Sequence, residues 1–99
     1  MVLGDPAADR VDVLGLAAGQ GRVVSTPDYR SDPRIPREPD DIEVAERLGL
    51  GAMAAAPLRA PGGDVIGTLA VNYRVPGRIA PERLEVLQAL ADHAAIAVW

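Results

Sequence analysis

The sequence contains no cysteine, no lysine and no phenylalanine, and it has a single histidine. The absence of cysteine excludes a disulfide framework, a thiolate nucleophile and a cysteine-type zinc site. Aromatic residues make up only 3% of the chain, so the core has to be built from aliphatic side chains and alanine, and each alanine buries little surface. A small domain with such a core is expected to be marginally stable alone or to rely on a partner.

Positive charge is also scarce, because Lys+Arg is 10 against 14 for Asp+Glu, which gives a net charge of −4. An acidic chain lacks the electrostatic footprint of a nucleic-acid-binding protein. Neither a signal-peptide core nor an uncharged run of about 18 apolar residues occurs, so no membrane association is indicated and a cytoplasmic location is expected. The 99 residues have room for one domain, over residues 1–99.

Glycine and proline divide the first half of the chain into short segments. The apolar spacing and the β-branched and acidic runs predict the type of each segment. Four prolines in one stretch predict a loop, because proline cannot donate to a strand or a helix interior. The predicted order is disorder over 1–8, a helix over 9–18, a strand over 22–26, a loop over 27–41 and a helix from Asp40 or Asp41 to Leu48.

A hairpin is predicted in the second half. Two apolar runs, over 52–60 and 65–73, flank a turn over 61–64, which favours antiparallel pairing. Pro57 cannot donate to a ladder, so the side of the strand to which its backbone nitrogen points has to face an edge or a bulge. Odd and even positions of the second run are assigned to opposite faces, and both faces are partly apolar, which is typical of a strand that is covered on both sides.

A long helix is predicted over 81–98, and Pro81 suits its first position. Apolar residues recur every three or four positions from Leu84 to Val98, and this apolar stripe is expected to face the sheet. A second line lies on another flank and is the candidate interface with another helix or a second copy of the chain. Its residues are Val86, Ala89, His93 and Ile96.

Three stretches carry a resemblance to a known family. The first is the loop with Asp28, Asp32, Pro33 and Arg34, which is similar to a D-x-x-x-D-P-R pattern. The second is Ala-Pro-Leu-Arg at 56–59 followed by Ile-Gly-Thr-Leu-Ala at 66–70. The third is the helix from Ala-Pro-Glu-Arg-Leu at 80–84 to Leu-Ala-Asp-His-Ala-Ala-Ile-Ala at 90–97. In this order and spacing they resemble the GAF domain, a small α/β sensory module of bacterial signalling proteins.

The resemblance implies an α/β (α+β) fold with an antiparallel sheet flanked by helices, and it covers roughly residues 13–98. The family's opening helix and first two strands have no counterpart, so an incomplete domain is expected. The strand over 65–73 would then present a bare apolar edge, and such edges recruit partners. A homo-oligomer or a companion chain that completes the sheet is therefore expected.

The missing residue types exclude several branches of that family. Its methionine sulfoxide reductases and its bilin-binding light sensors use cysteine, and its cyclic-nucleotide binders resemble an N-K-F-D-E set that needs lysine and phenylalanine. His93 has no partners at a usable spacing for a metal site or a catalytic triad, so it is interpreted as a helix-surface residue, with a haem ligand as the alternative. The sequence offers no catalytic nucleophile and no general base with a partner residue, so no enzyme activity is indicated.

The acidic residues of the proline-rich loop leave two interpretations open. Asp28, Asp32, Asp40 and Asp41 could serve with Arg34 as a cation site or a catalytic pair. The favoured interpretation is loop capping, in which Asp28 and Asp32 accept backbone N–H bonds and Arg34 pairs with one of them.

Two functional hypotheses remain. The first is a non-catalytic sensory module that binds an unidentified small molecule between the sheet and residues 27–50, and that signals through its last helix to an output domain such as a histidine kinase or a transcriptional regulator. The candidate lining residues are Tyr29, Arg34, Met53, Ala55, Leu69 and Val71. The second is a structural dimerisation module without a ligand, with the last helix as its interface. The small alanine side chains fit both hypotheses, because they leave volume for a ligand or allow close packing at an interface.

Overall fold

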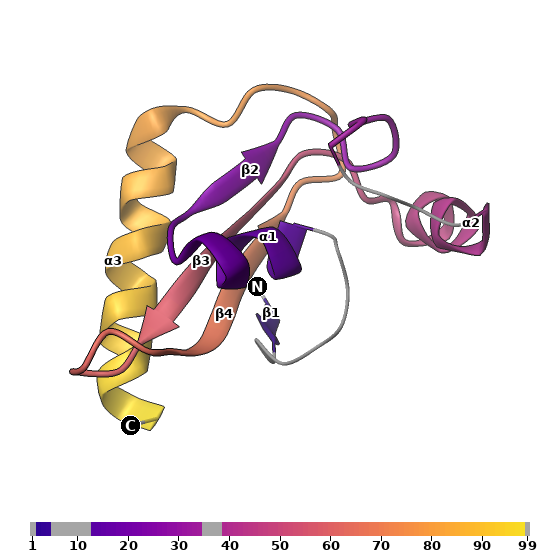
Figure 1. The fold of residues 1–99 in the computed structure, drawn as a ribbon. Coiled ribbons are helices and arrows are strands. Elements are labelled where there is room, and N and C mark those ends of the chain that lie inside the picture. The colour runs from indigo at the N-terminus through magenta and orange to yellow at the C-terminus, as the bar shows by residue number, and fades with distance from the viewer. Residues whose placement is uncertain (1, 5–12, 35–38, 99) are drawn as a thin grey trace.

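The computed structural model describes residues 2–4, 13–34 and 39–98, which form a four-stranded antiparallel sheet with helices packed on it (Figure 1). The strand order is β1-β4-β3-β2, so β3 and β4 are the central strands. The elements are β1 (Val2–Gly4), α1 (Val13–Gln20), β2 (Val24–Thr26), α2 (Pro39–Leu48), β3 (Met53–Arg59), β4 (Val65–Asn72) and α3 (Pro81–Val98). The predicted α+β class, with an antiparallel sheet flanked by helices, is confirmed.

α3 covers one face of the sheet and packs along β3. Its buried Leu87 and Ala91 lie in one apolar cluster with Ala54, Ala56 and Leu58 of β3. Alanine side chains let the helix and the strand approach closely, and Leu58 is the largest of the fully buried side chains. The core is thus thin, as expected for a chain so poor in aromatic residues.

α1 packs on the opposite face of the same two central strands. Ala17 of α1 is buried against Ala55 of β3 and Ala70 of β4, which are register partners. Because side chains alternate along a strand, Ala54 faces α3 while its neighbour Ala55 faces α1. Adjacent residues of β3 therefore contact the two helices.

The β4 edge, expected to be bare, is covered by β1. Val2 pairs with Ala70 and Gly4 pairs with Thr68, so the predicted disorder over 1–8 is wrong for these strand residues. The unpaired N–H and C=O groups of an edge strand stabilise a short extended segment that reaches them, and three residues are too few to show an alternation in sequence. The rest of that segment, and the start of the predicted helix over 9–12, lie outside the described residues.

A β-bulge in the hairpin changes which side chains of β4 face α3. Leu58 pairs with Gly67, whereas Arg59 pairs with Val65, so the register shifts by one residue at Ile66. Ile66 consequently packs with the α3 cluster, and its predicted place on the other face is wrong. A bulge inserts one residue into a ladder and inverts the alternation beyond it, which periodicity alone does not reveal.

Pro57 lies where the ladder needs no donor. β2 pairs with β3 only as far as Ala55, so Pro57 lies beyond the last described pair on that side, in agreement with the predicted edge position. Its carbonyl oxygen instead accepts a hydrogen bond from Gln88 Nε2, 3.3 Å away on α3. This bond ties α3 directly to a central strand.

α2 projects beyond one end of the sheet (Figure 1). Among its described side chains, Ala45 is buried, whereas Ile42, Val44 and Leu48 are exposed large hydrophobic residues. The helix ends at Leu48, and the next residue, Gly49, has a φ of 69°, the left-handed conformation that glycine adopts without strain. Both predicted ends of this helix are therefore close to the observed ones.

No described helix combines the length and the hydropathy that crossing a membrane requires.

Ala80 occupies the N-cap position of α3, where its carbonyl oxygen accepts hydrogen bonds from the N–H groups of Arg83 and Leu84. Alanine has no side-chain acceptor for the free N–H groups of the first turn. We expect Ala80→Asp to raise the free energy of unfolding by about 1 kcal/mol, measured by urea denaturation. Ala89→Asp, at an exposed position in the middle of the same helix, is the control, and an equal gain there would contradict a capping effect.

Candidate functional site

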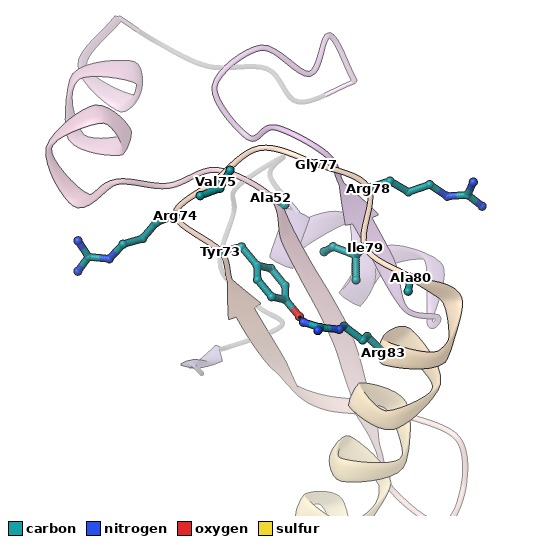
Figure 2. Close-up of a pocket in the computed structure, with 9 residues that line it drawn as sticks. All are labelled: Ala52, Tyr73, Arg74, Val75, Gly77, Arg78, Ile79, Ala80 and Arg83. Carbon is teal, nitrogen blue, oxygen red and sulfur yellow. Dashed lines mark hydrogen bonds between the residues drawn. The ribbon is translucent and has the colours of Figure 1, made fainter.

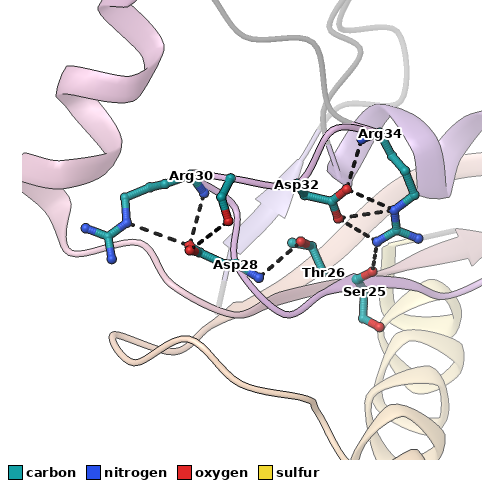
Figure 3. Close-up of polar contacts among 7 residues, drawn as sticks. Ser25, Thr26, Asp28, Arg30, Asp32 and Arg34 are labelled. Carbon is teal, nitrogen blue, oxygen red and sulfur yellow. Dashed lines mark hydrogen bonds and ion pairs between the residues drawn. The ribbon is translucent and has the colours of Figure 1, made fainter.

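The loop that follows β2 is held by an ion pair between Asp32 and Arg34 (Figure 3). Arg34 Nη2 donates to Asp32 Oδ2 at 2.6 Å, and Arg34 Nε donates to both carboxylate oxygens at 3.1 Å. The Arg34 backbone N–H also donates to Asp32 Oδ1, at 2.9 Å. The same Nη2 donates to the Ser25 carbonyl oxygen at 2.8 Å, so the pair ties the loop to β2.

Asp28 organises the first half of this loop. Its Oδ1 accepts the Arg30 N–H at 3.2 Å, and its Oδ2 accepts the Ser31 hydroxyl at 3.0 Å. The Asp28 N–H in turn donates to Thr26 Oγ1 at 3.2 Å. These are side-chain capping bonds of the kind that fix turns. The predicted loop capping by Asp28 and Asp32, with Arg34 as the partner of one of them, is confirmed.

The two partners of this ion pair differ in burial. The side chain of Asp32 is 6% exposed, whereas that of Arg34 is 61% exposed. The hydrogen bonds from the Arg34 side chain hold the pKa of Asp32 well below its usual range. Burial acts in the opposite direction, and the Thr26 hydroxyl and the Arg34 backbone N–H support the lowering. Asp32 therefore stays ionised throughout the neutral and mildly acidic range.

We expect Asp32→Asn to lower the free energy of unfolding by about 1–2 kcal/mol at pH 7, a moderate value because Arg34 remains in solvent. The pKa of Asp32 is lowered in the folded protein, so its stabilisation is present above the unfolded value of about 4 and is lost as the pH falls below it. Urea denaturation should thus show a difference between wild type and variant that shrinks from pH 7 to pH 3. Asp64→Asn, in the exposed hairpin turn, is the control, and a difference that grows on acidification would refute the assignment.

A pocket of about 540 Å³ lies between the end of α1, the start of β2 and this loop. Leu16 and Val24 supply apolar walls, and the two arginines Arg22 and Arg34 also belong to the lining. The remaining described lining residues are Gln20, Val23 and Ser25. Arg22 Nε donates to Gln20 Oε1 at 3.0 Å, which fixes one edge of that guanidinium. No acidic residue is among the described residues that line this pocket.

The sequence prediction included only Arg34 among the described residues that line this pocket, and it missed Leu16, Gln20, Arg22, Val23, Val24 and Ser25. The turn that joins α1 to β2 brings them together, since Gly21 has φ 65° and its N–H donates to the Ala17 carbonyl oxygen at 2.9 Å. Glycine reaches this left-handed conformation without steric cost. The segment Gly19-Gln20-Gly21 was the available signal, because a glycine just after a helix predicts a tight reversal that places the helix end beside the next strand.

The six candidate lining residues do not share one site. Tyr29, Met53 and Ala55 lie on the α1 face, and Arg34 lines the pocket at the end of α1. Leu69 and Val71 pack on the α3 face instead, so their assignment to a common pocket is wrong. The register pairs Ala55 with Ala70 rather than with an odd-numbered residue of β4, and both faces of β4 carry apolar residues, so the sequence pattern did not distinguish them.

One buried polar atom lies on the α1 face without a partner among the described residues. Thr68 Oγ1 accepts and donates no hydrogen bond there, although Thr68 is 1% exposed. Thr68 is two residues from Ala70 along β4 and therefore points to the same face. Buried hydroxyl groups in proteins are almost always hydrogen-bonded, so Thr68 is an exception among the described residues.

A second pocket, of about 420 Å³, lies between the end of β4 and the start of α3 (Figure 2). Ala52 and Ile79 are buried in it, and three arginines belong to its lining. Figure 2 shows that Arg74 and Arg78 point away from the pocket in different directions. Arg83 is engaged by Tyr73, with Nη1 3.3 Å from the hydroxyl oxygen and the guanidinium carbon 5.7 Å from the ring centroid. The arginines therefore do not converge on a shared ligand position.

The candidate interface residues of α3, Val86, Ala89, His93 and Ile96, are all exposed. Val86 also lines a largely apolar groove of about 360 Å³ between α3 and β4, together with Val71, Tyr73 and Leu90. His93 belongs to the helix surface, as expected. In the described parts of the chain, no three His, Asp or Glu residues gather to hold a metal ion.

Solved structures with related folds include two GAF-type proteins. The free methionine-R-sulfoxide reductase of Thermoplasma acidophilum is 21% identical with a TM-score of 0.67, and the alignment covers 99% of this chain and 59% of that one. The GAF domain of a phosphoenolpyruvate-protein phosphotransferase from Coxiella burnetii is 18% identical with a TM-score of 0.69, over 88% of this chain and 49% of that one. At these identities the likeness concerns the fold.

A relative among characterised proteins is the methyl sulfide methyltransferase-associated sensor of Methanosarcina acetivorans. It is 31% identical over 87 residues, which cover 88% of this chain and 8% of that protein. The chain thus spans a small fraction of this relative's length. The family model of the GAF domain matches residues 3–98, and this match together with the antiparallel sheet between α1 and α3 shows that the chain belongs to the GAF domain family.

Proposed function

We propose that this chain is a non-catalytic sensory module that binds a small molecule where α1, β2 and the loop with Asp32 and Arg34 meet. The pocket there has a volume of about 540 Å³, within the range of small-molecule sites. The Asp32–Arg34 pair holds one wall of it in place. The relative of Methanosarcina acetivorans, which is named a sensor, supports a regulatory role.

The observation that carries the proposal is the shared strand between the pocket elements and α3. Ala55 of β3 packs with α1, and the neighbouring Ala54 and Ala56 pack with α3. Gln88 of α3 is hydrogen-bonded to the Pro57 carbonyl oxygen. Closely packed alanine side chains cannot absorb a displacement, so a shift of α1 on ligand binding would move β3 and, through β3, α3.

The signal would leave the domain through α3 toward an output domain such as a histidine kinase or a transcriptional regulator, in the cytoplasm. GAF membership supports this direction, because the family is commonly sensory. The chain lacks the cysteines that the family's reductases use, which supports a role without catalysis.

Native mass spectrometry of the chain purified from cells tests the proposal, combined with hydrogen–deuterium exchange after removal of any retained ligand. The proposal predicts a retained small molecule, and slower exchange in α1, β2 and α3 when it is added back. A ligand-free protein whose α3 exchange is unchanged by a metabolite mixture would refute a sensory role.

The second candidate is a dimerisation module without a ligand, which the exposed flank of α3 favours. Val86 is 59% exposed and Ile96 is 78% exposed, and apolar side chains of this size at one flank suit a helix–helix contact. Sedimentation of wild type and Ile96→Glu separates the candidates. A dimer that persists without ligand, and that the substitution dissociates, would support the structural role.

A further inference from the structure

We propose that the pocket at the end of α1 recognises a small organic carboxylate with a short apolar body, and that Arg22 and Arg34 bind its carboxylate. The inference rests on the proposed sensory function and adds the chemical class of the ligand. It also assigns a binding role to Arg22, which lies in the turn before β2.

The charge of the pocket is the first argument. The chain has a net charge of −4, yet two arginines and no acidic residue are among the described residues that line this pocket. Asp32 lies next to it and is paired with Arg34 through both carboxylate oxygens, so Arg22 supplies the excess positive charge among the described lining residues and Arg34 supplies an oriented donor. A local positive site on an acidic protein selects an anion, because the rest of the surface repels it.

The second argument is that Arg34 is oriented before any ligand arrives. Its Nε and Nη2 are held by Asp32, and Nη2 is also held by the Ser25 carbonyl oxygen. Figure 3 shows the remaining nitrogen, Nη1, pointing away from Asp32. Among the described residues, no acceptor is bonded to Nη1, so this donor is available to a ligand without loss of the existing bonds.

Arg22 is also held by one hydrogen bond. Its Nε donates to Gln20 Oε1 at 3.0 Å, and its two terminal nitrogens have no bonded acceptor in the described part of the chain. A guanidinium group presents its donors in a fixed fork that matches a carboxylate. Two partly anchored forks at one pocket provide charge-assisted hydrogen bonds, the strong class of such bonds.

The apolar walls define the rest of the ligand. Leu16 and Val24 line the pocket and are half-buried members of the α1-face cluster. An inorganic anion would leave these walls in contact with water, whereas a short aliphatic group would cover them and gain from their desolvation. The combination therefore favours a carboxylate with an aliphatic chain over a free phosphate.

Titration of the full chain with hexanoate, followed by two-dimensional NMR, tests this site. Hexanamide, which has the same body without the charge, and inorganic phosphate are the comparison probes. We expect hexanoate to shift the amide signals of residues 16–25 and 34, and to bind at least about tenfold more tightly than either comparison probe. If hexanamide bound as tightly as hexanoate, recognition of the carboxylate charge would be refuted. If phosphate bound as tightly as hexanoate, the contribution of the apolar walls would be refuted.

Arg22→Gln and Arg34→Gln should each weaken hexanoate binding by about tenfold or more. Arg22 is exposed and bonded only to Gln20 among the described residues, so Arg22→Gln tests binding without disturbing the loop. Arg78→Gln, an exposed arginine outside this pocket, is the matched control and should bind as wild type does. Unchanged affinity in both pocket variants, or no binding by wild type, would overturn the proposal.

The outcomes also separate this inference from the sensory role. A neutral molecule retained from cells that slows exchange in α1 and α3 would overturn the carboxylate assignment and leave the sensory role intact. Hexanoate binding at the two arginines without any change in α3 exchange would support the site and count against signalling through α3.

Discussion

Leu58→Ala is expected to remove most of the stability of this domain, about 3–4 kcal/mol of unfolding free energy. Leu58 of β3 is fully buried against α3, and its neighbours in the apolar cluster include Ala56, Leu87 and Ala91. Its register partner on β4 is Gly67, which has no side chain to move into the space left behind. The cost of such a cavity is high where the surroundings cannot collapse.

The total stability of a small domain is of order 5 kcal/mol, so this variant should be largely unfolded at moderate urea concentrations. Urea denaturation followed by circular dichroism measures the change. Leu90→Ala is the matched control, because Leu90 lies on the same helix as Leu87 and is 42% exposed; it should cost less than about 1 kcal/mol. Equal losses in the two variants would show that Leu58 is not the centre of the core.

Gly51→Ala should destabilise the domain by about 2–3 kcal/mol, through a clash with backbone rather than with a flexible side chain. A Cβ at Gly51 would lie 2.8 Å from the Tyr73 carbonyl oxygen and 2.8 Å from the Val75 carbonyl carbon. Gly51 also donates its N–H to the Tyr73 oxygen at 2.8 Å, and its own carbonyl oxygen accepts the Tyr29 N–H at 2.9 Å. The substitution thus opposes a contact that joins three segments.

Gly62→Ala is the matched control for this prediction. Gly62 lies in the hairpin turn, where an added Cβ would meet nothing within 4 Å, so the same chemical change should be nearly neutral there. Urea denaturation compares both variants with wild type. A second readout is exchange of the Tyr29 amide, which should accelerate in Gly51→Ala because its acceptor moves. A Gly51→Ala protein as stable as Gly62→Ala would contradict the close approach.

The position of Gly51 connects stability with the proposed function. It holds Tyr29, which packs on the α1 face, and it holds the end of β4 before the segment that leads to α3. Under the proposed function, a change in the loop over 27–34 would reach the end of β4 through the contacts of Gly51, and it would reach α3 through Ala54 and Ala55 of β3.

The elements that sequence reasoning predicted well are those whose signals are local. Pro81 and the apolar stripe of the last helix predict α3 with its observed bounds, and the turn over 61–64 predicts the hairpin. The bonds that Asp28 and Asp32 accept from Arg30, Ser31 and the Arg34 backbone span two or three positions, so residue types in sequence order were enough to expect them.

The candidate site was predicted only in part. Of the six predicted lining residues, only Arg34 is among the described residues that line the pocket at the end of α1. Tyr29, Met53 and Ala55 lie on the α1 face, and Leu69 and Val71 pack on the α3 face. The dimerisation role of the α3 flank stays a prediction. Arg22 was missed because only the turn after α1 brings it into the lining of the same pocket as Arg34, which lies twelve positions later in the chain.

The sequence by itself determined the family motifs, the helix and hairpin positions, the capped loop and the chemistry that the missing cysteines exclude. Only the tertiary structure decided which face each alanine covers, that the bulge at Ile66 inverts part of β4, and that Val2–Gly4 closes its edge. The physical reason is that capping and periodicity act over a few residues, whereas register and edge pairing depend on segments distant in the chain, and small side chains on both faces leave the register without a local signature.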